Sequence, residues 1–445
     1  MSSPRSTSRL IPPLLRERTF RRYWTGQTIS LFGDQVSILA LPLTAILVLH
    51  AGAAETGYLT AAGLAPSLFF SILAGGWVDR KGHRRRVMLS ADIARALLLA
   101  SIPIAYLLGG LSFAQLYAVA FAGGCASVMF SVAQSTVFAS IVAPGDYVDA
   151  NSLIHGSRAL SFVGGQSAGG VLVQLLTAPG AIVIDAVSFL GSALFLRRIH
   201  PEEPATAPGG RGHLTEGARF IARSAVVRAL LATTATINIF SFIAVAIFVL
   251  YATRDLGVSP AQLGLVLGAG AVGAVIGAGM TSWVSRRLGV GATFTLGCVL
   301  FTAPAILLPL AFGAGKPVIL ALLFAAEFGS GVGVVMLDIT IGAILTASIP
   351  APLRARVSGA YSTINYGLRP VGALIGGALG STLGLHATMW IATTAALAGV
   401  IWLLPSPVPR LRTLDLQPDA SPPGEVAAGS GAEVMGGGVS GPTSS

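Results

Sequence analysis

Two acidic residues lie inside long apolar stretches, one in each half of the chain. Asp34 is near the middle of residues 23–49, and Glu327 is about eleven residues into residues 317–345. An ionised carboxylate is costly in a hydrocarbon environment, and acids kept at such positions mark ion pathways and proton relays. A carboxyl group that alternates between its neutral and charged forms can load and release a proton. Asp34 and Glu327 are therefore candidates for proton coupling.

Three basic residues accompany these acids and leave two interpretations open. His155 and Arg158 are one helical turn apart, and Arg369 lies in an apolar stretch of the second half. An arginine that faces a central cavity can bind an anionic substrate. Alternatively, Arg158 neutralises Asp34, and Arg369 neutralises Glu327, as permanent structural pairs. These three residues are candidates either for the cavity or for charge pairing.

The most basic segment of the chain, residues 75–86, lies directly between two apolar runs. Asp79 in this segment can accept hydrogen bonds from the free amides of a helix that begins near Arg356, where the helix dipole favours an anion. Such a contact would form in only one conformation, and we name this predicted element the latch. Asp92 and Arg95, three residues apart, are expected to pair on one helix face and to brace it. The predicted latch comprises Gly75, Asp79, Arg80, Gly82, Arg84 and Arg85. The alternative is that the basic loop only fixes membrane topology.

The composition is that of a protein that crosses a membrane many times. Charged residues make up 10% of the chain and hydrophobic residues 53%, whereas about a quarter of a soluble domain is charged. A transmembrane helix needs about 20 apolar residues. The sequence predicts twelve such helices, at residues 23–49, 55–77, 87–109, 113–142, 151–176, 180–196, 229–251, 260–284, 291–312, 317–345, 356–381 and 386–404.

The net charge of +10 does not indicate a nucleic-acid-binding protein, because the basic residues are confined to alternate loops. With twelve helices, Arg254 and Lys316 are the basic residues in loops of one side, and nearly all the others fall on the opposite side. The positive-inside rule then places both termini in the cytoplasm. We expect a multi-pass protein of the cytoplasmic membrane with the bilayer as its surroundings.

Two segments repeat at half the length of the chain. Residues 165–172 (GQSAGGVL) resemble residues 372–379 (GALIGGAL), 207 residues later, and Trp77 has an echo at Trp283. Two six-helix halves in the same orientation are typical of one large class of secondary transporters. We expect the chain to function as a monomer.

The predicted fold is therefore an all-α polytopic membrane protein with twelve helices in two parallel six-helix repeats. The expected parts are a cytoplasmic N-terminal segment (1–22), an N-terminal six-helix bundle (23–196), a cytoplasmic linker with an amphipathic helix at 214–226 (197–228), a C-terminal six-helix bundle (229–404) and a disordered cytoplasmic tail (405–445).

The basic segment resembles the loop motif of the major facilitator superfamily, Gly-x-x-x-Asp-Arg-x-Gly-x-Arg-Arg. All of its specified positions are present, at Gly75, Asp79, Arg80, Gly82, Arg84 and Arg85. Other segments resemble the drug:proton antiporter branch of macrolide-efflux and enterobactin-exporter type. These are Gly33-Asp34 with Ala40-Leu41-Pro42, residues 149–153, residues 184–189, and Arg356-Val357-Ser358 with residues 367–370. Asp185 and Asp338 match this branch, without a role that follows from the sequence.

Two departures from the family pattern qualify this resemblance. Gln166 occupies the proline position of the antiporter motif in the fifth helix, and residues 113–142 lack the arginine that several antiporter families carry in the fourth. The resemblance implies proton-coupled efflux of an amphipathic drug, antibiotic or siderophore by alternating access. The alternatives are a uniporter or importer of a nutrient or lipid, and a non-transporting membrane sensor.

Several other functions find no support in the sequence. The glycine-rich stretches lack the Lys-Ser/Thr that follows a phosphate-binding loop, so no nucleotide site is predicted. Cys125 and Cys298 both fall in apolar runs, which implies buried thiols and neither a disulfide nor a metal site. No nucleophile–base pair stands out, and we expect a transporter without a cofactor, not an enzyme.

Overall fold

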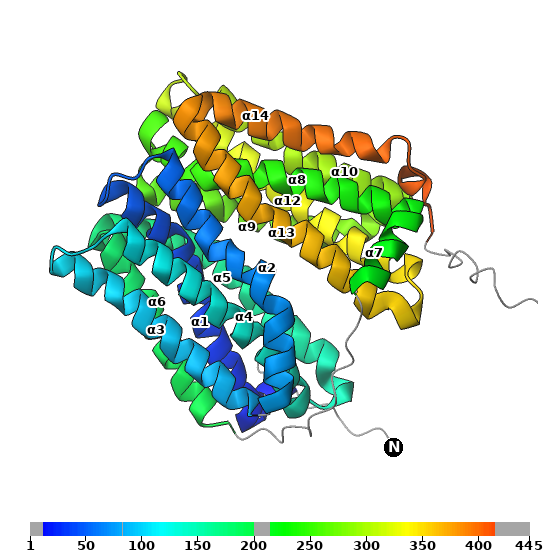
Figure 1. The fold of residues 1–445 in the computed structure, drawn as a ribbon, viewed down its shortest axis with the longest axis horizontal. Coiled ribbons are helices and arrows are strands. Elements are labelled where there is room, and N and C mark those ends of the chain that lie inside the picture. The colour runs from blue at the N-terminus through cyan, green and yellow to red at the C-terminus, as the bar shows by residue number, and fades with distance from the viewer. Residues whose placement is uncertain (1–11, 82, 200–213, 414–445) are drawn as a thin grey trace, which may run out of the picture.

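The computed structural model describes residues 12–81, 83–199 and 214–413, and within these residues the chain is helical without strands (Figure 1). Ten helical segments in this part of the chain are long and apolar enough to cross a membrane. Helices α2 and α13 have 29 residues each, which at about 1.5 Å per residue also exceeds the hydrocarbon thickness. The described residues are thus consistent with the twelve predicted spans.

Six long helices form the N-terminal bundle. They are α1 (Arg18–Leu47), α2 (Ala53–Lys81), α3 (Arg84–Leu107), α4 (Phe113–Ile141), α5 (Tyr147–Leu176) and α6 (Ala178–Arg197). Short 3-10 turns precede α1 and α5, at η1 (Pro13–Arg16) and η2 (Pro144–Asp146). Within this bundle α1 packs against α5 and α6, while α3 packs against α4 and α6.

The C-terminal bundle repeats this order after the linker. Its spans are α8 (Ala225–Leu250) with the π turn η3 (Tyr251–Asp255), α9 (Pro260–Leu288), α10 (Val290–Thr302) with η4 (Pro304–Ile306) and α11 (Leu307–Leu310), α12 (Lys316–Ser348), α13 (Arg354–Thr382), and α14 (Leu385–Ala398) with η6 (Gly399–Leu403). Pro304 lacks an amide hydrogen and interrupts the ninth span. Figure 1 shows this bundle, green to orange, beside the blue-to-green N-terminal bundle.

The linker contains the expected amphipathic helix, α7 (Leu214–Arg223), which packs against the start of α13. Its Ile221 is buried, and Glu216 forms an ion pair with Arg356 of α13. Gly217 lies so close to the backbone of Arg356 that a side chain there would collide with it. The linker helix is therefore attached to the C-terminal bundle.

The predicted disordered tail begins later than the sequence suggested. Residues 405–413 are ordered and include a 3-10 turn, η7 (Val408–Arg410), in which Val408 is fully buried. The carbonyl of Leu411 accepts a hydrogen bond of 2.9 Å from the amide of Gly291 at the start of α10. These contacts order a Pro-rich segment that has no periodicity of its own. The remainder of the predicted tail lies outside the described residues.

The two bundles contact each other at one end, mainly through two pairs of helices. In the α2–α13 pair, a Cβ on Gly57 would lie only 2.7 Å from the Cα of Gly377. In the α5–α9 pair, a Cβ on Gly170 would lie 2.8 Å from the Cα of Gly264. Small residues allow this close approach of helix backbones, as is usual inside membranes. Here they close one end of the boundary between the bundles.

The same helices separate toward their other ends. Ser167 of α5 faces Gly268 of α9 near the closed end. Three turns farther along each helix, on the same faces, a Cβ added to Gly156 or Gly279 would meet no described atom within 4 Å. Figure 1 shows α2 and α13 diverging in the same direction, toward Lys81 and Arg354. The boundary between the bundles is thus closed at one end and open at the other.

One connection in the N-terminal bundle is unusually short. Thr177 is the single residue between α5 and α6, and it has a positive φ of 71°. Such a backbone angle is uncommon for a β-branched residue. Its hydroxyl accepts a hydrogen bond of 3.4 Å from the amide of Gly180 and caps α6. Helices α5 and α6 are therefore joined by a tight turn with no intervening loop.

We predict that Gly57→Val opens the closed end of the boundary. The added side chain would overpack the contact with α13 by about 1–3 kcal/mol, because it meets backbone atoms that cannot move alone. The distance between spin labels at the exposed Leu108 and Leu383 should lengthen, with Cys125 and Cys298 first replaced by alanine.

Gly63→Val in the same helix is the matched control, because a Cβ there meets no described atom within 4 Å. An unchanged label distance in Gly57→Val, or an equal change in Gly63→Val, would show that the glycine contact does not hold this end closed.

Candidate functional site

Asp34 lies at the centre of α1, where α1 crosses α6. At the preceding residue, Gly33, a side chain would collide with the hydroxyl of Ser188 and the carboxylate of Asp185. The missing side chain lets the two helices approach, and it brings a carboxyl group of α6 beside that of α1. Asp34 and Asp185 interact electrostatically, and Asp185 is 1% exposed.

A buried ion pair on α3 adjoins these two acids. Arg95 and Asp92 form the predicted pair, and both lie among the buried residues of the bundle. The guanidinium of Arg95 stacks between two aromatic rings, 4.7 Å from the centroid of Phe130 and 4.0 Å from that of Phe189. Both members of the pair interact electrostatically with Asp34. The pair therefore belongs to the surroundings of Asp34.

We name Asp34, Asp92 and Asp185, with Arg95, the carboxyl cluster. Its groups come from α1, α3 and α6, and three carboxyl groups share one buried guanidinium. Arg158 of α5 contributes to the field at Asp34 less than Arg95 does. Among the described residues no ion pair joins Asp34 to Arg158, so the first alternative pairing is not formed.

Several polar atoms around the carboxyl cluster are incompletely bonded. Asp185 accepts a hydrogen bond of 3.0 Å from the hydroxyl of Ser188. The second carboxylate oxygen of Asp92 is buried without a full hydrogen bond among the described residues. The hydroxyls of Ser192 and Ser37 lie beside the carboxyl groups of Asp92 and Asp185 without reaching full hydrogen-bond geometry. In a low-dielectric interior, unpaired negative charge of this kind is strongly unfavourable. A proton on one of the acids would remove part of that repulsion.

Glu327 lies apart from the other charged groups. It is partly buried on α12, and its carboxylate lies against Gly270 of α9. The described residues contain no ion pair between Glu327 and Arg369, so the second alternative pairing is not formed either. The structure thus separates the two predicted proton-coupling residues into different surroundings, one with charged neighbours and one without.

A row of hydrogen bonds joins α8 to α13 in the C-terminal bundle. The hydroxyls of Thr234 and Tyr361 are 2.6 Å apart. One turn farther along both helices, the side-chain amide of Asn238 donates to Asn365 at 3.0 Å. Arg369 then donates from Nε to the side-chain oxygen of Asn238 at 2.8 Å. We name these five residues the polar ladder, and Arg369 is its last member.

His155 lies on the α5 face that is turned toward the C-terminal bundle. It is eleven residues, or three turns, before Gln166, whose carbonyl lies against Gly264 of α9. Both His155 and Arg158 are exposed, and Gln166 donates a hydrogen bond of 3.1 Å to Gln35 of α1. His155 therefore sits beside the open part of the boundary between the bundles.

The structure describes only part of the predicted latch. Gly75, Asp79 and Arg80 belong to α2, but their side-chain positions and all of Gly82 lie outside the described residues. The latch residues on α3 are described. Arg84 is buried, and Arg85 donates a hydrogen bond to the carbonyl of Ile199.

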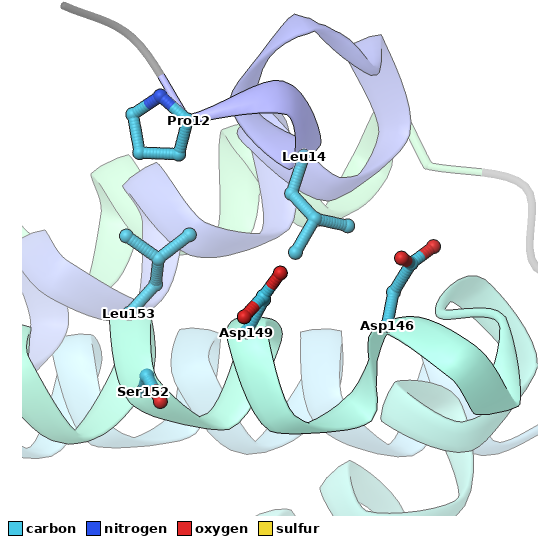
Figure 2. A pocket seen from close by; sticks show the side chains of 6 residues that line it. All are labelled: Pro12, Leu14, Asp146, Asp149, Ser152 and Leu153. Carbon is cyan, nitrogen blue, oxygen red and sulfur yellow. The ribbon is translucent and has the colours of Figure 1, made fainter.

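A surface pocket lies between the N-terminal turn η1 and the start of α5 (Figure 2). It is lined by Pro12, Leu14, Asp146, Asp149, Ser152 and Leu153. Figure 2 shows Pro12 opposite Leu153, and Leu14 opposite the carboxyl groups of the two aspartates. None of the predicted proton-coupling or cavity residues lines this pocket.

Sequence reasoning missed two features of the site. It assigned no role to Asp185, and it did not foresee the asparagines of the polar ladder. In each case the sequence contains a partial indication of the contact. Gly33 beside Asp34 marks a close helix crossing, and Asn238 and Asn365 are amides placed within apolar helices, where unpaired polar groups are costly.

Comparison with known families and proteins agrees with this architecture. Residues 23–367 and 230–431 match the model of the Major Facilitator Superfamily. The multidrug efflux pump Tap of Mycolicibacterium fortuitum is 27% identical over 404 residues, which cover 86% of this chain and 94% of the relative. The multidrug efflux pump Tap of Mycobacterium tuberculosis (strain H37Rv) is 28% identical over 407 residues, covering 87% and 93%.

A solved structure has the same fold at low sequence identity. The crystal structure of a bacterial homologue of the iron transporter ferroportin, in an inward-facing state, superposes with a TM-score of 0.71. The alignment covers 88% of this chain and 99% of that chain at 17% identity. This likeness concerns the fold alone.

We predict that Arg95→Gln destabilises the protein more than Asp92→Asn does. Loss of Arg95 leaves three carboxyl groups without their buried counter-charge, at a cost of about 3–5 kcal/mol. Loss of Asp92 leaves Arg95 with two other acids nearby and should cost less than half of that. Thermal unfolding of both variants in detergent at neutral pH measures the difference.

The loss of thermal stability in Arg95→Gln should become smaller at acidic pH, because protonated carboxyl groups no longer need the counter-charge. Equal losses in the two variants, or a deficit of Arg95→Gln that does not depend on pH, would contradict a shared carboxyl cluster.

Proposed function

The chain belongs to the major facilitator superfamily, and from this premise we propose that it exports amphipathic small molecules across the cytoplasmic membrane in exchange for protons. Transport proceeds by alternating access, in which one six-helix bundle rocks against the other. The likeness to two multidrug efflux pumps, over most of the length of each, supports export of drug-like compounds.

The proposed orientation follows from the distribution of basic residues. Arg84, Arg85 and Arg356 lie at the helix ends where the two bundles are apart, whereas Arg254 and Lys316 lie at the opposite ends. The positive-inside rule then places the open end in the cytoplasm, together with both termini and the linker. With this orientation the structure is the inward-facing state, in which a compound enters the boundary from the cytoplasm.

The observation that carries proton coupling is the carboxyl cluster. Asp34 and Asp185 lie side by side in the middle of the N-terminal bundle, and the buried arginine nearest to them is already bonded to Asp92. Two neighbouring acids with so little counter-charge favour the uptake of one proton between them. We propose Asp34 as the residue that loads and releases it, and Asp185 as its partner.

The position of the carboxyl cluster suits a proton-coupled carrier. The acids belong to α1 and α6, which pack against α5, and α5 forms part of the contact between the bundles. A change of charge on Asp34 therefore acts on helices that move between access states. A ligand or proton shifts such an equilibrium only by its differential affinity for the two states. Glu327, which has no charged neighbour among the described residues, is proposed as a secondary site of proton binding.

We predict that Asp34→Asn abolishes proton-coupled transport. Inside-out vesicles with an acidic lumen and a pH dye should alkalinise on addition of transported amphipathic compounds. The signal should fall to the level of empty vesicles in Asp34→Asn and should be reduced in Asp185→Asn, because an amide cannot carry the proton. Asp146→Asn, at an exposed acid near the start of α5, is the matched control and should retain it.

The other outcomes separate the alternative functions. Compound flux that does not depend on pH and survives in Asp34→Asn would indicate a uniporter and return the acid to a structural role. Net movement of the compound in the opposite direction would indicate an importer. Tight binding without flux would indicate a membrane sensor.

We propose that the latch forms in the other access state, in which Asp79 reaches the N-terminus of α13. In the present state Arg356, at that terminus, is paired with Glu216 of the linker helix. Asp79→Asn should lower the transport rate severalfold without lowering the amount of protein in the membrane, because the amide cannot carry the charge that the helix dipole favours.

Arg86→Gln, at an exposed position of the same basic segment, is the control for a general effect of loop charge. Transport by Asp79→Asn at the wild-type rate would argue that the segment only fixes topology.

A further inference from the structure

The guanidinium of Arg369 is held in a defined position by three neighbours. Its Nε donates to Asn238, which is itself fixed by Asn365 and by the carbonyl of Thr234. Its Cζ lies 4.2 Å from the ring centroid of Tyr366 and 5.0 Å from that of Phe242. An arginine with so many fixed contacts loses little conformational freedom when it binds a ligand.

No ion pair among the described residues neutralises the charge of Arg369. Asp338 of α12 is a charged neighbour that interacts with it electrostatically, but it lies beyond ion-pair distance. Among the described residues, the two terminal nitrogens of Arg369 have no hydrogen-bond acceptor, since its single hydrogen bond is the one from Nε. These nitrogens form the planar fork that matches a carboxylate or another pair of oxygens.

Tyr366 lies on the α13 face that is turned toward the N-terminal bundle, and Arg369 lies between that face and the one packed against α8. Gly377 and Gly380, three turns farther along α13, contact Gly57 and Ala53 of α2 at the closed end. Tyr366 and Arg369 stand eleven residues before them, where the atoms of α2 nearest to Gly367 belong to the side chain of Leu68 and not to the backbone. Tyr366 is 47% exposed there. The pair is therefore presented to the boundary between the bundles.

We propose that Arg369, with Tyr366 and Phe242, binds a planar anionic group of the substrate, such as a carboxylate attached to an aromatic ring. The fork of Arg369 takes the two oxygens, and the flanking rings contact the attached apolar surface. This inference rests on the proposed function, because it names the substrate class of the same central boundary. It assigns to the C-terminal bundle a binding role that is separate from the proton site in the N-terminal bundle.

The test measures equilibrium binding of three matched probes to the full-length protein in nanodiscs. The probes are 2-naphthoate, 2-naphthamide and 2-naphthylmethylammonium, which share one ring system and differ in charge. Wild type should bind 2-naphthoate at least about tenfold more tightly than the other two, as expected for a charge-assisted contact in a partly buried site. Equal affinity for all three probes would overturn the proposal.

Single-residue variants test whether the preference for 2-naphthoate arises at Arg369. Arg369→Gln should remove the preference for 2-naphthoate and change the affinity for 2-naphthamide by less than about twofold, whereas Arg369→Lys should keep part of it because a point charge remains. Arg287→Gln is the matched control, because Arg287 also stacks on an aromatic ring, that of Trp283 at 5.6 Å. A loss of affinity for all probes in Arg369→Gln, or the same loss in Arg287→Gln, would contradict a specific site.

Asn238→Ala provides a second variant in case Arg369→Gln does not fold. It keeps the charge but releases Nε, and it should weaken binding of 2-naphthoate about threefold to tenfold without affecting the ammonium probe. Unchanged binding of 2-naphthoate would count against the proposal. Since binding is measured without a proton gradient, its outcome is independent of the transport test. Selective binding without proton exchange would refute only antiport, and proton exchange without selectivity would refute only this site.

Discussion

The absence of water inside the membrane is the constraint on which this structure depends. A charge in that environment must be neutralised, bonded to dipoles or removed by a proton. The N-terminal bundle meets this requirement with one arginine, enclosed by two phenylalanine rings, that serves a group of three acids. The C-terminal bundle meets it with amides and aromatic rings around an arginine that forms no ion pair within the described part of the chain. The two halves share a fold but solve the same electrostatic problem with different partners, an ion pair within a group of acids in one and neutral amides with aromatic rings in the other.

Close approach of helices through small residues connects the fold to its chemistry. Gly57 and Gly377 bring the two bundles into backbone contact at the closed end. Gly33 does the same within one bundle and sets Asp185 beside Asp34. In both places the relevant property is the missing side chain, because a methyl group would keep the helices apart. The same physical device therefore closes the boundary and assembles the carboxyl cluster.

Much of the fold could be predicted from the sequence, because span length and the charge of loops are local properties. The apolar runs agree with the helices to within several residues, and the pair of Asp92 and Arg95 follows from their spacing on one helix. The long-range neighbours could not be predicted. Whether Asp34 meets Arg158 or Asp185 depends on the rotation of α1 and on where it crosses α6, and periodicity carries no such information. For the same reason the sequence could not show that Arg369 bonds to Asn238 and lies apart from Glu327. The order of residues 405–413 was missed because it comes from tertiary contacts with α10.

The turn at Thr177 has a mechanical consequence. With a single residue between them, the adjoining ends of α5 and α6 cannot move apart. Helix α5 carries Gly170, which contacts α9, and α6 carries Asp185. In the proposed exchange with protons, a displacement at the contact between the bundles would reach the carboxyl group of Asp185 through the backbone at Thr177. Repulsion between the carboxyl groups would act on that contact by the same route, with no chain of side chains needed to relay it.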